Sequence, residues 1–127
     1  MGFWIFMLAM GLLFPAIMIL FGAVFTKAAP KRINYIFGYR TELSMKNRDT
    51  WEFAHKYFGK LWFRFGLLLI PITVIPMLFV ISKTENIVGT VGLIVGFINT
   101  IVLIVPIFFT EKVLNKTFDK DGKRKAE

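Results

Sequence analysis

The chain of 127 residues contains no cysteine and a single histidine, His55. The lack of cysteine excludes disulfides, thiolate metal sites and cysteine nucleophiles. One histidine excludes a metal site built from several histidines of one chain, and the nearby Asp49 and Glu52 do not have a recognised ligand spacing. We therefore expect neither a metal site nor a cofactor.

Charged side chains are absent from three long stretches, and this absence predicts the fold class. Residues 2–26 and 86–110 carry no charge, and each stretch exceeds the roughly 20 residues needed to cross about 30 Å of hydrocarbon. Residues 65–82 are also uncharged, although two prolines interrupt them. The sequence predicts an all-α membrane protein with three transmembrane helices in a single domain, residues 1–127.

The same absence bears on function. No Asp, Glu, Lys, Arg or His lies in the core of any predicted span. Proton-coupled transport and intramembrane carboxylate catalysis normally need an ionisable group at that depth. Both functions are therefore disfavoured.

Basic residues are distributed unevenly between the loops. Of the 16 Lys and Arg residues, nine lie in the connector, residues 27–64, and six in the tail, residues 111–127. The short loop between the second and third spans has one, Lys83. The positive-inside rule then predicts a protein of the cell membrane with its N-terminus outside and its connector and C-terminus in the cytoplasm. Basic residues are expected beside an anionic leaflet, so we predict no nucleic-acid partner.

The second half of the connector has helical periodicity. Its apolar face consists of Trp51, Ala54, Phe58, Leu61, Trp62 and Phe65. Glu52, Lys56, Lys60 and Arg64 form the opposite, polar stripe. This pattern predicts an amphipathic cytoplasmic interfacial helix that precedes the second span, with Asn47 or Asp49 as its N-terminal cap.

The third predicted span contains a stripe of small and polar residues, Gly89, Gly92, Gly96 and Asn99. Their spacing of three and four places them on one helix face, where small residues allow another helix to approach closely. An unpaired amide is costly in hydrocarbon, so we expect Asn99 to face protein or water. We interpret this stripe as a helix-packing surface.

Several connector residues have both a chemical and a structural interpretation. His55 is either an interfacial hydrogen-bonding residue or a general base. Ser44 and Thr41 would need an activating base to act as nucleophiles, and the sequence identifies none. Arg40 either binds a phosphate, carboxylate or lipid headgroup, or anchors the interface beside Glu42. No catalytic residue is predicted, and a non-enzymatic protein is favoured.

The connector also carries a specific motif. It comprises Asn34, the run Gly38-Tyr39-Arg40-Thr41, the run Ser44-Met45-Lys46, and then Trp51, Ala54 and Gly59. This pattern resembles the signature of the SdpI family, and the resemblance extends to the order of the spans. In the longer architecture of the namesake, a further membrane domain precedes the half that this chain resembles.

The resemblance implies immunity or signalling. The namesake protects toxin-producing Gram-positive bacteria from a secreted membrane-active peptide of the SdpC type, and captures an ArsR-like repressor at the membrane. From the motif, together with the nearby His55, we expect a site for a partner or a lipid at Asn34, Gly38, Tyr39, Arg40, Thr41, Ser44, Met45, Lys46, Trp51 and His55. The expected partners are membrane lipids, with a peptide toxin or a cytoplasmic regulator as further candidates.

Two other functions remain open from the sequence. One is an anionic-lipid-binding protein or enzyme at the cytoplasmic leaflet, in which Arg40, Lys46 and His55 hold the headgroup. The other is a small transporter built as a homo-oligomer, because three helices enclose little pore by themselves.

Overall fold

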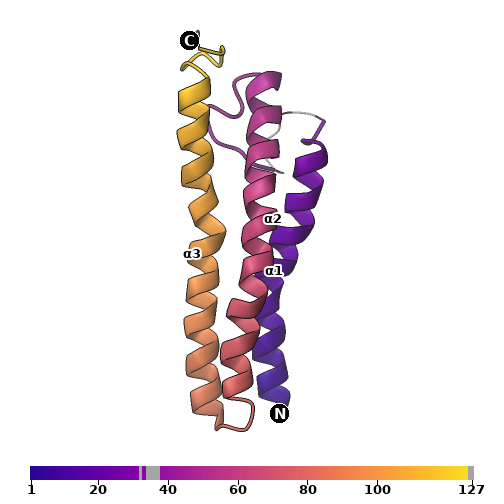
Figure 1. The fold of residues 1–127 in the computed structure, drawn as a ribbon, viewed down its shortest axis with the longest axis vertical. Helices are drawn as coiled ribbons and strands as arrows, with labels where there is room; N and C mark the ends of the chain where they lie inside the picture. Colours follow the sequence, from indigo (N-terminus) through magenta and orange to yellow (C-terminus); the bar gives the residue numbers. More distant parts are fainter. Residues whose placement is uncertain (32, 34–37, 126–127) are drawn as a thin grey trace.

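The computed structural model describes residues 1–31, 33 and 38–125 and contains three long helices (Figure 1). These are α1 (Gly2–Lys27), α2 (Arg48–Phe79) and α3 (Glu85–Thr117). Within the described residues, β-structure is limited to one isolated bridge between Phe118 and Arg124. All three helices are long and apolar enough to cross a membrane, so this is an all-helical, multi-pass membrane protein.

The second helix is longer than the sequence analysis predicted. The segment expected to form an interfacial helix before the second span is the first half of α2, and it continues without a break into the predicted span. The first proline of this helix is Pro71, so nothing before it interrupts the hydrogen-bond ladder. The apolar face of this half is buried inside the protein at Trp51, Ala54 and Phe58.

Asn47 caps the start of α2. Its side chain accepts a hydrogen bond from the backbone N–H of Thr50 at 2.9 Å, and the Thr50 hydroxyl accepts one from the backbone N–H of Asn47 at 3.2 Å. This reciprocal pair is a capping box. Of the two caps that the sequence allowed, the structure has Asn47.

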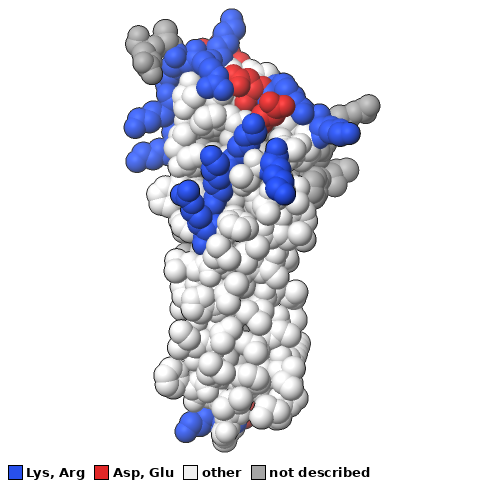
Figure 2. Space-filling view, turned by 45° about the vertical axis from the view of Figure 1, so that its right-hand side comes forward, with Lys and Arg blue, Asp and Glu red and all other residues white. Residues whose placement is uncertain are grey.

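The connector and the C-terminal tail lie at the same end of the bundle, and the N-terminus lies at the other (Figure 1). Two contacts join the tail to the start of α2. The Asn47 amide donates to the carbonyl of Gly122 at 2.7 Å, and Arg124 donates twice to Asp49, at 2.9 and 2.8 Å. Lys and Arg side chains gather at this end, which we call the basic end (Figure 2).

The backbones of α1 and α2 approach each other closely at Gly22 and Gly59. A Cβ on Gly22 would lie 2.8 Å from the carbonyl oxygen of Gly59, and a Cβ on Gly59 would lie 2.9 Å from that of Gly22. Side chains larger than glycine therefore do not fit here, because the atoms they would meet are backbone. Gly59 belongs to the motif, but the sequence pattern does not reveal this contact.

The glycines of α3 differ from one another in their surroundings. Gly89 faces the ring of Phe3 and Gly92 faces Met7, both on α1, whereas a Cβ on Gly96 would meet nothing within 4 Å. Asn99 is fully buried and donates to the Gly11 carbonyl at 3.1 Å and to the Thr73 hydroxyl at 3.0 Å. Asn99 thus links all three helices midway along the bundle, while Gly96 lies on its outer surface.

Substituting Gly59 by alanine should destabilise the bundle. The added methyl would lie 2.8 Å from the backbone nitrogen of Thr26, so α1 and α2 must move apart, and the free energy of unfolding should fall by about 1–3 kcal/mol. The measurement is SDS-induced unfolding in mixed micelles, followed by circular dichroism. Gly96→Ala is the matched control and should leave stability unchanged or slightly raised, because alanine favours a helix over glycine by about 1 kcal/mol. Equal behaviour of the two variants would contradict this description of the packing.

Candidate functional site

The motif residues from Gly38 to Ser44 pack between α2 and α3 at the basic end. Gly38 has a φ of +102°, a conformation that side chains with a Cβ rarely adopt. A Cβ at this position would also lie 2.5 Å from Nε2 of His55. Glycine is therefore needed both for the turn and for the close approach of the connector to α2.

Tyr39 joins the two helices on either side of it. Its side chain is buried, its backbone N–H donates to His55 Nε2 at 2.9 Å, and its hydroxyl donates to Glu111 Oε2 at 2.6 Å. Burial, followed by the hydrogen bond to Glu111 and the charge of that carboxylate, raises the pKa of Tyr39 well above its ordinary value. Tyr39 therefore remains a protonated donor at physiological pH.

Glu111 accepts a second hydrogen bond on the same oxygen, from the Thr41 hydroxyl at 2.7 Å. The sequence analysis assigned Glu111 to the tail, but α3 continues to Thr117 and places this carboxylate on the helix, facing the connector. The carboxylate lies 72 residues from Tyr39 along the chain, so no local pattern links them. The one sequence signal for this site was that Glu111 directly follows the charge-free stretch of residues 86–110.

His55 is fully buried, and both of its ring nitrogens have backbone partners. Nδ1 lies 2.8 Å from the carbonyl oxygen of Trp51, which can only accept, and Nε2 faces the N–H of Tyr39, which can only donate. These partners fix a neutral imidazole with its proton on Nδ1. The ring also packs edge-on against Phe25 at 4.9 Å between centroids. His55 thus holds the connector in place.

The hydroxyls of the motif also have structural partners. Ser44 Oγ accepts from the backbone N–H of Thr41 at 2.8 Å and donates to the Thr41 carbonyl at 2.8 Å. The Thr50 hydroxyl reaches the Ser44 carbonyl at 3.1 Å. Trp51 Nε1 donates to the carbonyl of Pro30 at 2.8 Å, where the chain leaves α1. We call the set Tyr39, Thr41, Ser44, His55 and Glu111 the connector brace.

Other predicted site residues lie outside the connector brace. Arg40 is exposed, and Met45 is half-buried. Lys46 is exposed and forms an ion pair with Glu42 at 3.9 Å, a contact that contributes little stability at a surface. Asn34 lies outside the described residues. Arg40 and Lys46 are therefore the predicted residues that present charge at the surface.

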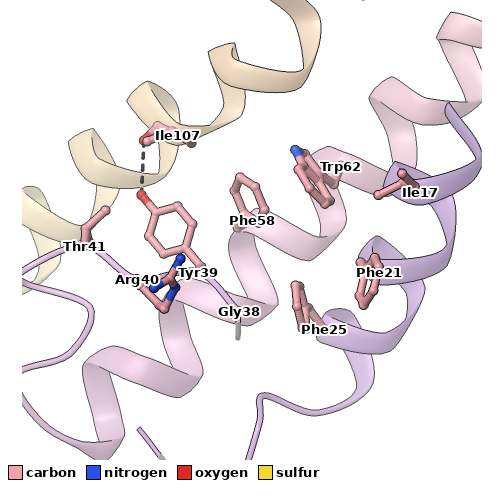
Figure 3. A pocket seen from close by; sticks show the side chains of 10 residues that line it. All are labelled: Ile17, Phe21, Phe25, Gly38, Tyr39, Arg40, Thr41, Phe58, Trp62 and Ile107. Atoms are coloured by element: carbon pink, nitrogen blue, oxygen red, sulfur yellow. Dashed lines mark hydrogen bonds between the residues drawn. The ribbon is translucent and has the colours of Figure 1, made fainter. Parts of the chain in front are cut away.

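An apolar groove of about 400 Å³ lies directly beside the connector brace. Its walls are Ile17, Phe21 and Phe25 of α1 and Ile107 of α3, and its floor is Phe58 and Trp62 of α2 (Figure 3). Residues Gly38 to Thr41 of the connector line the remaining side. We call this feature the lateral groove; its volume is within the range of about 300–1,000 Å³ typical of small-molecule sites.

Comparison with known proteins identifies relatives of the motif region. Residues 31–110 match the family model described as the SdpI/YfhL protein family. An uncharacterized protein, YfhL of Bacillus subtilis (strain 168), is 36% identical over 59 residues, which cover 46% of this chain and 54% of the relative. The matched segment therefore spans about half the length of that relative. No solved structure matches the chain.

Removing the Tyr39 hydroxyl should destabilise the basic end. Tyr39→Phe leaves Glu111 with one donor fewer, and losing a hydrogen bond to a charged group costs about 1.5–3 kcal/mol. SDS-induced unfolding measures the loss. Tyr57→Phe removes the same atom from the half-buried Tyr57, which stacks on Phe53, and should change stability by less than about 0.5 kcal/mol. A Tyr39 variant as stable as the Tyr57 variant would show that the hydroxyl does not hold the connector.

Proposed function

Because the chain belongs to the SdpI/YfhL family, we propose that it confers resistance to a membrane-active peptide or acts in related envelope signalling. In this proposal it is a non-enzymatic protein of the cytoplasmic membrane. One observation carries the proposal. Tyr39, Thr41 and Ser44 of the motif lie in the connector brace together with His55, and both nitrogens of His55 are bonded to backbone groups. A histidine held in this way does not activate a nucleophile, which favours recognition over covalent chemistry.

The connector brace fixes the shape of the basic end. It holds residues 38–44 against α2 and α3, and the capping box and the tail contacts fix the start of α2 beside it. The exposed side chains of Arg40 and Lys46 therefore extend from a backbone that is held in place. In our proposal this surface either binds a cytoplasmic partner or keeps the bundle intact when a peptide disturbs the membrane.

We propose that the basic end faces the cytoplasm, with the N-terminus and the short loop after α2 outside. Fifteen of the 16 Lys and Arg residues belong to the connector and the tail, which lie at the same end of the bundle. The positive-inside rule assigns that end to the cytoplasm.

Expression of the protein in a bacterial strain sensitive to a secreted membrane-active peptide tests the proposal. Survival should rise with the intact protein and with Gly96→Ala. It should fall back toward the level of the empty vector with Glu111→Ala, because this change removes the carboxylate to which both the Tyr39 and Thr41 hydroxyls donate and leaves Tyr39 only the more distant Ile107 carbonyl. Unchanged survival with intact, correctly inserted protein would contradict the resistance function.

Insertion is checked in the same cells. Since the chain has no cysteine, a single introduced thiol reports its own position. With Ser82→Cys, a membrane-impermeant maleimide should label intact cells, whereas with Asp121→Cys it should label only after lysis. Labelling of Asp121→Cys in intact cells, with Ser82→Cys labelled only after lysis, would contradict the proposed orientation.

A further inference from the structure

The lateral groove exists because α1 and α3 are in direct contact at one end and are separated at the other. Near the N-terminus, Gly89 and Gly92 of α3 face Phe3 and Met7 of α1, and farther along Asn99 bonds to Gly11. At the basic end the connector lies against α3 instead, through Tyr39 and Glu111. The space left between the two helices is the lateral groove (Figure 3).

The hydroxyl and indole groups that line the lateral groove donate hydrogen bonds within the protein. The hydroxyls of Tyr39 and Thr41 donate to Glu111, and Trp62 Nε1 donates to the Leu103 carbonyl at 3.1 Å. The remaining lining consists mainly of aromatic rings and isoleucine side chains. Such a surface favours a hydrocarbon chain over a polar ligand.

One cation lies at the mouth of this apolar groove. Among the described residues that line it, Arg40 is the only charged one, and it is exposed at the basic end (Figure 3). A guanidinium binds phosphate with two parallel hydrogen bonds. The lining therefore offers hydrocarbon contacts along the spans and an anion-binding group near the level of the lipid headgroups.

We propose that the lateral groove holds one acyl chain of an anionic phospholipid, with the lipid phosphate on Arg40. Residues of two spans, α1 and α3, form walls of the groove, and the wall residue Ile17 is 42% exposed, so a lipid can reach the groove from the bilayer. A peptide helix has a diameter of about 10–12 Å with its side chains and a pitch of about 5.4 Å, so a groove of about 400 Å³ would hold roughly one turn of it. This assignment goes beyond the resistance function and does not require it.

Fluorescence quenching tests the assignment, because Trp62 lies on the floor of the lateral groove. The full chain carrying Trp4→Phe is placed in nanodiscs that contain phosphatidylglycerol or phosphatidylethanolamine with brominated acyl chains. The Trp4 change removes the tryptophan at the other end of the bundle, and Trp51 is fully buried. At equal mole fraction, brominated phosphatidylglycerol should occupy the groove about three-fold more strongly, the preference expected from an exposed ion pair.

Two pairs of variants separate this site from general lipid contact. Arg40→Gln should abolish the preference for phosphatidylglycerol, whereas Lys56→Gln removes an exposed charge outside the groove lining and should keep it. Ile17→Phe should fill the groove and lower quenching with both lipids, whereas Leu20→Phe, on the exposed face of α1, should not.

The assignment would be overturned if Arg40→Gln and Lys56→Gln showed the same lipid preference, or if Ile17→Phe and Leu20→Phe showed the same quenching. If Ile17→Phe abolished resistance but left quenching unchanged, the groove would belong to the peptide and the lipid assignment would also be wrong. Loss of the lipid preference with normal resistance would support the lipid site and separate it from the proposed function.

Discussion

The carboxylate of Glu111 organises the basic end of the bundle. One of its oxygens accepts hydrogen bonds from the hydroxyls of Tyr39 and Thr41, at 2.6 and 2.7 Å. Hydrogen bonds to a charged acceptor are roughly twice as strong as neutral ones, and a partly buried carboxylate without donors is costly. Because Tyr39 also donates its backbone N–H to His55, this one connector residue couples α3 to α2. These two contacts hold the part of the connector around Tyr39 between the two helices.

Several features of the molecule follow from a connector held in this position. Gly38 can approach His55 because it has no Cβ, and the imidazole is kept neutral by its two backbone partners. The lateral groove remains open because the connector, and not α1, covers α3 at this level. Gly38, Tyr39, Ser44 and His55 have no common chemistry, but they share a structural role. That role is to shape a surface and a groove at the end of the bundle where basic residues gather (Figure 2).

The sequence predicts the helices better than it predicts their contacts. Charge-free runs located all three helices, because hydrocarbon excludes ionised side chains whatever the tertiary structure. The first half of α2 was predicted as an interfacial helix because an apolar face has the same periodicity whether it meets lipid headgroups or protein. The small-residue pattern on α3 did not reveal that Gly96 is outside, nor that α1 and α2 approach each other closely at Gly22 and Gly59. Glu111 was missed because its partners lie 70 and 72 residues away along the chain.

A double-mutant cycle between Tyr39 and Glu111 tests the central claim most directly. The free energies of unfolding of Tyr39→Phe, Glu111→Ala and the double variant are compared with that of the original chain in the same mixed micelles. A connector held by this contact predicts a coupling energy of about 1–3 kcal/mol, within the range measured for residues in one hydrogen-bond network. A coupling energy near zero would contradict the claim, since the two side chains would then contribute independently.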